Sequence, residues 1–172
     1  ANITQKLIDS NMLPEAQAVW RGNCSTSNSL AFDGGFDQLD TTKTGTGFDW
    51  RLTTQGDVDI QATQDAAGNR RLELEVNAPL SVPVIRQRIV LKPGRYRLTW
   101  RTPETTQKAA TGLTASLACA PSLRDALPGA ADGAAKDMHV QEFIVDSSCA
   151  VGELVFWLSP KSQIHLDDIT LR

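Results

Sequence analysis

The sequence predicts a mainly β protein, an antiparallel β-sandwich preceded by a short N-terminal helical hairpin. Three observations favour this fold class. From Leu30 onward, segments of alternating apolar and polar residues recur every ~8–15 residues, with turn-forming residues between them. Before Leu30, the apolar residues instead have helical spacing. The length of 172 residues suffices for one such domain and a small appendage.

Residues 1–23 are expected to form a helical segment. Ile3 and Leu7 share one helical face. Pro14 suits the first turn of a second helix, which ends near Arg21. The pattern Leu-Ile-x3-Met-Leu-Pro-Glu-Ala-x2-Val-Trp is similar to the closing unit of a tetratricopeptide-repeat array, which would continue upstream because one unit cannot bury its own apolar face. The alternative is a helical cap docked on the domain that follows.

Residues 30–172 are expected to form the β-sandwich, as a binding domain. A Gly34-Gly35 turn lies near its start, and Lys92-Pro93-Gly94 predicts a tight turn before the segment with the cleanest alternation, 95–101. The nine expected strands span residues 48–52, 58–62, 71–76, 82–91, 95–101, 113–119, 140–145, 153–158 and 163–171.

Composition argues against several classes of partner. The net charge of -3 and the pI near 5.3 provide no basic field, so nucleic acid is not an expected partner. The hydrophobic content of 41% is ordinary for a globular protein. No apolar run approaches the roughly 18–20 residues that span a bilayer, so we expect no membrane span in this chain.

The residues offer little for catalysis, and no enzyme activity is expected. His139 and His165 lie in different expected strands and lack a neighbouring nucleophile. Ser147-Ser148-Cys149 lacks the glycines of a hydrolase nucleophile elbow. Glu73 and Glu75 could suggest a glycosidase, but acids two residues apart on a strand are common on protein surfaces. The sequence contains no phosphate loop or dinucleotide fingerprint.

Two of the three cysteines are placed for a disulfide. Cys119 ends one expected strand and Cys149 follows another, so a bond between them would close the polar loop from 120 to about 137. In the chain-entropy model, closing such a loop stabilises the folded protein by about 3 kcal/mol. The bond favours an oxidising compartment, periplasmic or extracellular, and leaves Cys24 as a free thiol. The alternative is two free, buried cysteines in a cytosolic protein.

Three motifs carry a resemblance to a known family. Phe32-Asp33-Gly34-Gly35-Phe36-Asp37 resembles the N-G-G-F-E opening of galactose-binding-like jelly-roll modules, which are carbohydrate-binding-module-like domains. Residues 91–98 are similar to their L-x-P-G-x-Y-x-L hairpin, and residues 166–171 to their closing D-D/N-V/I-x-L strand. The motifs occur in the family's order and cover residues 30–172. The resemblance implies a jelly-roll sandwich with a noncatalytic binding function.

A longer string of residues resembles a narrower group. It consists of Gly47 to Leu52, the hairpin, Gly112-Leu113, Cys119 and Cys149. It is similar to bacterial exported proteins that append such a module to tetratricopeptide repeats, in exopolysaccharide or exosortase systems. The resemblance implies a location in the bacterial envelope, with a glycan or another envelope protein as partner.

The family resemblance also implies a structural calcium ion. Many modules of the family hold one between the opening turn and the last strand, where Asp33, Asp37 and Asp168 match. Calcium takes roughly 6–8 oxygen ligands and would neutralise acids that repel one another. Asp33 replaces the family's Asn, and Asp37 its Glu. The alternative is that Asp33 and Asp37 make turn hydrogen bonds while Asp167 and Asp168 form a solvated bulge.

A sugar site needs an aromatic face with polar groups around it. Trp50 and the adjacent Arg51 are the expected contacts, whereas most other aromatic residues are assigned to the core. Trp157 is one residue out of phase with Phe156, so the two side chains point in opposite directions.

Arg86 and Arg88 alternate with apolar residues along one strand face. Together with the arginines at 95, 97 and 101 they could bind acidic glycans. The alternative is a solvated face paired with Glu73 and Glu75.

These observations predict a noncatalytic carbohydrate-binding-like module of a bacterial exported protein that binds an envelope or exported polysaccharide. The alternative is a protein-interaction or architectural domain of a secretion or polysaccharide-export assembly. An exposed aromatic platform discriminates between them. If Trp50, Trp100 and Trp157 are all buried, the glycan hypothesis loses its main chemical support.

Overall fold

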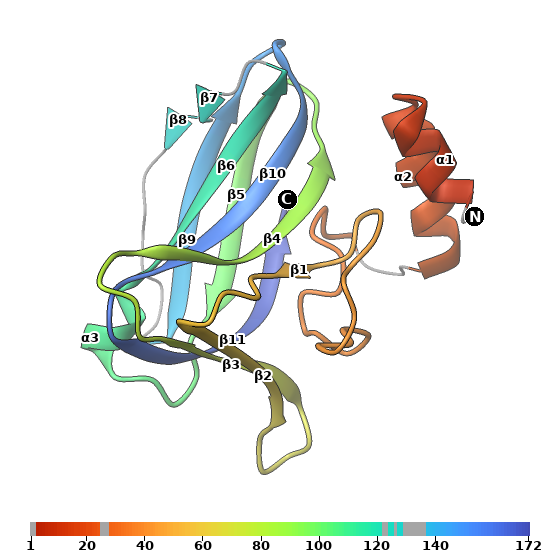
Figure 1. The fold of residues 1–172 in the computed structure, drawn as a ribbon. Helices are drawn as coiled ribbons and strands as arrows, with labels where there is room; N and C mark the ends of the chain where they lie inside the picture. Colours follow the sequence, from red (N-terminus) through yellow and green to blue (C-terminus); the bar gives the residue numbers. More distant parts are fainter. Residues whose placement is uncertain (1–2, 25–27, 122–123, 126, 129–136) are drawn as a thin grey trace.

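The computed structural model describes residues 3–24, 28–121, 124–125, 127–128 and 137–172. In this part of the chain the protein is a mainly β sandwich of two antiparallel sheets with a short N-terminal helical pair beside it (Figure 1), which confirms the predicted fold class. None of the helices described is long and apolar enough to cross a membrane.

Most elements lie where the sequence pattern predicts them. The helices are α1 (Ile3–Asp9), α2 (Leu13–Cys24) and α3 (Gln107–Ala110). The strands are β1 (Arg51–Leu52), β2 (Val58–Gln64), β3 (Arg70–Val76), β4 (Val82–Val90), β5 (Gly94–Arg101), β6 (Leu113–Pro121), β7 (Arg124–Asp125), β8 (Leu127–Pro128), β9 (Met138–Val145), β10 (Cys149–Leu158) and β11 (Ser162–Leu171). The nine expected strands correspond to β1–β6 and β9–β11, whereas α3, β7 and β8 carry no such pattern.

β1 is shorter than the strand expected at 48–52. Phe48 belongs to a turn instead, because the amide of Asp49 donates a hydrogen bond to the carbonyl of Thr46 over 2.9 Å. The Asp49 carboxylate in turn accepts the Thr46 amide at 3.1 Å. The chain therefore enters the sheet only at Arg51, opposite Arg86 of β4.

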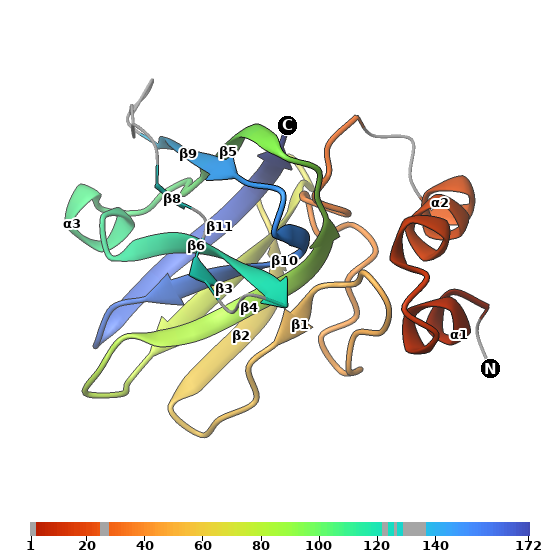
Figure 2. The same cartoon turned by 90° about the horizontal axis from the view of Figure 1, so that it is seen from above.

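The strands form two facing layers. One sheet has the order β1-β4-β10-β6-β7, and the other has the order β2-β3-β11-β5-β9-β8. Figures 1 and 2 show these layers packed face to face. Because successive side chains on a strand point to opposite faces, each strand supplies alternate residues to the core. Along β10, Leu154, Phe156 and Leu158 are fully buried between the sheets.

The opening turn closes one edge of the sandwich. The backbone of Phe32 pairs with the buried Gln87 side chain of β4 through two 2.9 Å hydrogen bonds. On the opposite sheet, the amide of Ile169 donates to the carbonyl of Gly34 over 3.0 Å. A Cβ at Gly34 would lie 1.9 Å from the Ile169 carbonyl oxygen, so the close approach requires glycine here. The motif resembling the family's opening is therefore a structural clasp between the two sheets.

A disulfide joins Cys119 of β6 to Cys149 of β10, as predicted. Both cysteines are buried. Cys24 ends α2. The loop expected between the two bonded cysteines lies largely outside the described residues, apart from β7 and β8.

The helical pair docks on the sandwich through an aromatic cluster. The Trp20 ring lies 5.5 Å from Phe32 and 6.1 Å from Phe48, edge to face in both cases. Gly47, with a φ of 60°, leaves the space that the Trp20 ring occupies. The helices are thus packed against the following domain. Whether they also end a tetratricopeptide-repeat array stays a prediction.

Candidate functional site

The outer face of the five-stranded sheet carries the most exposed aromatic residue of the described chain. Along β10, the residues between the core positions point outward, among them Glu153, Val155 and Trp157. Trp157 is 37% exposed, whereas Val155 is buried and forms the floor beside it. The expectation that Trp157 and Phe156 face opposite ways is confirmed. Trp100 and Phe48 are buried, as expected for most of the aromatic residues, and Trp157 is an exception.

A hydrogen bond orients the Trp157 ring on this face. Its indole Nε1 donates to the hydroxyl of Ser116 on β6 over 3.0 Å. The pairing of β10 with β4 shifts register between Phe156 and Trp157, opposite Pro83, which places the bulge next to the ring. A held, exposed indole presents an electron-rich face, which is the chemistry that stacks on the C–H groups of a sugar.

Three predicted ligand residues meet on the same sheet face as this ring. Arg51 of β1 pairs with Arg86 of β4, and Arg88 follows on the same face. The three side chains line a depression of about 330 Å³ together with Glu153 of β10. We call this set, Arg51, Arg86, Arg88 and Glu153, the arginine depression. Arg86 Nε lies 3.8 Å from Glu153 Oε1, a long ion pair between two partly exposed groups.

The charges in the arginine depression are unbalanced. Burial lowers the pKa of the Arg51 guanidinium, and the positive charge of Arg88 lowers it further, with a smaller effect from Arg86. Only the carboxylate of Glu153 opposes them. The described residues that line the depression therefore carry more positive than negative charge.

Trp50 is not part of this face, which corrects its assignment as the sugar contact. It is 1% exposed, and its ring packs 5.9 Å from Phe36 and 6.3 Å from Phe156. Its Nε1 donates to the carbonyl of Asp33 over 3.0 Å. Because the chain enters β1 only after Trp50, the preceding turn directs this side chain into the core. Trp50 stabilises the opening turn and has no ring face free for a ligand.

The remaining arginines do not join the arginine depression. Arg95, Arg97 and Arg101 lie on β5 in the six-stranded sheet. Arg101 pairs with Asp137 at 2.9 Å and with Asp168 at 3.2 Å. The five arginines expected on one surface are thus divided between the two sheets.

The alternative pairing with Glu73 and Glu75 is also wrong. Both acids lie on β3 of the six-stranded sheet, whereas Arg86 and Arg88 lie on β4 of the other sheet. Glu153 is the carboxylate that Arg86 faces.

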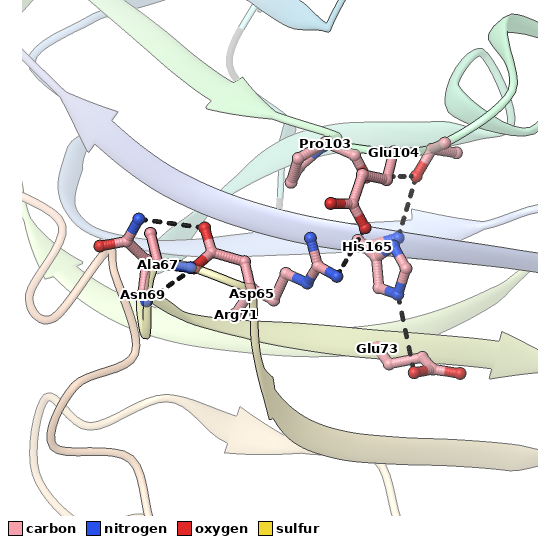
Figure 3. A network of polar contacts seen from close by, with 9 residues as sticks. Asp65, Ala67, Asn69, Arg71, Glu73, Pro103, Glu104 and His165 are labelled. Carbon is pink, nitrogen blue, oxygen red and sulfur yellow. Dashed lines mark hydrogen bonds and ion pairs between the residues drawn. The ribbon is translucent and has the colours of Figure 1, made fainter.

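Glu73 belongs instead to a polar network on the six-stranded sheet (Figure 3). His165 Nε2 lies 3.6 Å from the Glu73 carboxylate, and the His165 amide donates to the Thr105 hydroxyl over 3.1 Å. The buried Arg71 pairs with Glu104 at 2.8 Å nearby. These contacts tie the segment after β5 to β3 and β11. They account for the position of each group without a ligand.

The opening turn and β11 do bring acidic residues together. Burial raises the pKa of Asp33, and the nearby charge of Asp37 adds to this. Burial likewise raises the pKa of Asp167 to about 6, with repulsion from Asp168 and a smaller repulsion from Asp37. Of the pair Asp167 and Asp168, the sequence analysis assigned Asp168 to the expected calcium site. Asp167 is the buried one of the two.

The described contacts of these acids need no metal ion. Calcium needs roughly 6–8 oxygen ligands, and in the part of the chain that the structure describes no three His, Cys, Asp or Glu side chains gather to hold a metal ion. The Asp33 carboxylate accepts the Gln38 amide at 3.1 Å, and the Asp168 carboxylate faces Arg101. The register of β11 against β5 also shifts between Asp167 and Thr170. Turn hydrogen bonding and a bulge match the alternative interpretation, and calcium stays a prediction.

A groove lies between the helical pair and the five-stranded sheet. This groove, of about 860 Å³, is largely apolar. It is lined by Ile8, Asn11, Leu13, Pro14, Gln17, Leu30, Arg88, Val90, Leu91, Lys92, Tyr96, Ala150 and Val151. It meets the arginine depression at Arg88 and Val151, which line both.

Comparisons with known proteins find structural relatives only. No family model matches the chain, and no curated protein matches it. Among the solved structures, 17 chains match. One is the enzymatically active domain of tailspike protein 4 of bacteriophage CBA120, with a TM-score of 0.55 and 15% identity. That match covers 83% of this chain but 21% of the tailspike chain.

Another match is the module TmCBM61, solved in complex with β-1,4-galactotriose. The TM-score is 0.52 and the identity is 13%, over 85% of this chain and 99% of that chain. At such identities the likeness concerns the fold alone. The fold of that module is therefore shared over most of this chain.

Proposed function

We propose that this chain is a noncatalytic glycan-binding module of a bacterial exported protein, which binds an envelope or exported polysaccharide. The observation that carries the proposal is Trp157, an exposed indole held by Ser116 on the sheet face that also carries a polar depression. An aromatic ring together with a few convergent polar groups is the usual composition of a small-ligand site. The likeness of the fold to a carbohydrate-binding module supports the proposal.

Two features support the absence of catalysis. The His139 ring stacks on Trp100 at 5.4 Å, and its Nε2 lies 2.8 Å from the Thr102 hydroxyl. These contacts occupy the ring face and one ring nitrogen of His139. His165 is held within the network of Figure 3. Because one structural relative is an enzymatically active tailspike domain, any glycan that binds should also be assayed for release of reducing ends.

The test is a glycan array followed by calorimetric titration of each glycan that binds. Trp157→Ala should weaken binding about 5- to 30-fold, because stacking an indole is worth roughly 1–2 kcal/mol. Ile144→Ala is the matched control, since Ile144 is 43% exposed on β9 of the other sheet. Equal binding by both variants and the wild type would refute the assignment of the site to Trp157.

The second candidate is a protein-interaction or architectural domain of a secretion or polysaccharide-export assembly. It is favoured by the apolar groove between the helical pair and the sheet. A blank array, combined with loss of partner binding on Leu13→Asp in the groove, would support this function. Binding of a glycan that depends on Trp157 but not on Leu13 would argue against it.

The cellular context belongs to the same proposal. The disulfide between β6 and β10 is consistent with a periplasmic or extracellular location, because such bonds persist in oxidising compartments. The repeat array and the exopolysaccharide system that the sequence suggests are further proposals. Fractionation of cells and sequencing of the surrounding open reading frames test them directly.

A further inference from the structure

The arginine depression carries an inference about the chemistry of the ligand. We infer that Arg51, Arg86 and Arg88 bind an anionic group of the glycan, a carboxylate or a sulfate ester, so that the recognised polysaccharide is acidic. This inference rests on the proposed function, because it concerns the same glycan that stacks on Trp157.

The first support is the lack of internal partners. In the described part of the chain, neither Arg51 nor Arg88 lies within ion-pair distance of a carboxylate, and Arg86 has only the 3.8 Å contact with Glu153. On the other sheet, by contrast, Arg101 engages two carboxylates. The positive charge of the depression is therefore available to a ligand.

The second support is that positive charge gathers at this depression although the chain as a whole is negatively charged. The whole chain carries a formal net charge of -3, yet three arginines converge on one depression with one acid among its described lining residues. Arg51 and Arg88 are only partly exposed, so salt screens their charge less than that of a fully exposed side chain. Holding like charges together costs free energy, and a bound anion would offset that cost.

The third support is the position relative to Trp157. Arg86 and Ser116 both pair with Val155, from the strands on its two sides, so they lie about 10 Å apart across the sheet. The indole of Trp157 donates to Ser116, so the ring extends toward this row of residues. Such a separation allows one sugar to stack on the ring while a neighbouring sugar of the same chain extends an acidic group toward Arg86.

The chemistry of the side chains suits both anions. A guanidinium presents several N–H donors in a planar fork, which matches the two oxygens of a carboxylate and the oxygens of a sulfate. A neutral sugar would leave these donors to water and would gain little from three of them. The arrangement therefore favours acidic over neutral glycans.

The experiment compares three oligosaccharides by calorimetric titration with the intact chain. They are an oligogalacturonate that carries carboxylates, a sulfated galactan oligomer, and neutral β-1,4-galactotriose. We expect at least one acidic oligomer to bind about tenfold more tightly than the neutral one, as one charge-assisted interaction provides. Preference for the first assigns a uronate, and preference for the second assigns a sulfate ester.

Paired double variants test the location. Arg86→Gln with Arg88→Gln should abolish the preference for the acidic oligomer. Arg95→Gln with Arg97→Gln removes the same charge from exposed positions on the other sheet and should leave the preference unchanged. Equal affinity of the wild type for all three oligomers, or equal losses in both double variants, would overturn the inference.

The design separates this inference from the proposed function. If neutral and acidic oligomers bind equally and Trp157→Ala weakens both, the module binds glycans but the anion subsite is refuted. If neither these three oligomers nor any glycan of the array binds, the glycan function itself fails and the inference fails with it.

Discussion

Replacing the buried Asp167 by asparagine should stabilise the protein at neutral pH and remove part of its pH dependence. Asp167 is 9% exposed, and burial together with repulsion from Asp168 raises its pKa from 3.8 to about 6. Its Oδ1 accepts the amide of Asp168 over 2.7 Å. An asparagine oxygen can accept the same hydrogen bond, so the substitution removes the charge and keeps the contact.

The sign and size of the effect follow from proton linkage. Between pH 3.8 and about 6, the folded protein binds more protons at Asp167 than the unfolded chain does, so the contribution to stability falls as pH rises. It is fully present below the unfolded pKa and is lost once pH exceeds the folded pKa. A shift of about two pKa units corresponds to roughly 3 kcal/mol, so Asp167→Asn should gain roughly 2–3 kcal/mol at pH 7.5 and little at pH 3.5.

Urea denaturation at several pH values measures this effect. The wild-type free energy of unfolding should decline between about pH 4 and 6 relative to that of Asp167→Asn. Asp57→Asn, the same change at an exposed loop position, should keep the wild-type pH dependence. A parallel pH profile for wild type and Asp167→Asn would refute the electrostatic reasoning. Repeating the titration with calcium tests the metal prediction, because a bound ion would raise the wild-type midpoint and Asp37→Asn would abolish that rise.

Three further perturbations test the fold around the site. Trp50→Phe should lose roughly 1–3 kcal/mol of stability in urea denaturation because the Asp33 carbonyl loses its donor, yet glycan affinity should stay within about twofold. A large loss of affinity at unchanged stability would restore Trp50 as a contact. Gly34→Ala should cost at least about 3 kcal/mol because its Cβ would overlap the Ile169 carbonyl, whereas Gly35→Ala, whose Cβ has ordinary contacts, should cost under about 1 kcal/mol. Equal losses of stability in Gly34→Ala and Gly35→Ala would contradict the close packing of Gly34 against Ile169. Reduction of the disulfide between β6 and β10 should lower stability by roughly 3–4 kcal/mol, and an unchanged melting temperature would show that the bond stabilises nothing.

Local patterns in the sequence were sufficient to predict most strands. Alternation along 95–101 gave β5 almost to the residue, since side chains on a half-buried strand must alternate between core and solvent. The positions of Cys119 and Cys149 at expected strand ends, on either side of a polar loop, likewise predicted their disulfide. The pattern failed at 48–52, where the Asp49 carboxylate caps a turn and the strand begins later. β7 and β8 were not predicted because strands of two residues are too short to show a periodic pattern.

The sequence also held an unused signal about the site. Trp157 has the same parity as Glu153 and the opposite parity from Phe156, and that alternation places it on the outer face of β10. Trp50 was wrongly predicted as a sugar contact because the charged residues on either side of it resemble the pattern of a half-buried strand. The turn before β1 instead directs its ring into the core.

Within the regular strands, alternation along the chain thus determined by itself which side chains face solvent and which face the core, whereas at Trp50 a turn replaces the expected strand. Only the tertiary structure decided which outward residues share a surface. β4 lies between β1 and β10, so Arg51, Arg86 and Glu153 meet, while the arginines of β5 face away on the opposite layer. The physical reason is that strand order depends on long-range pairing and on the packing of two sheets, and no local periodicity encodes either.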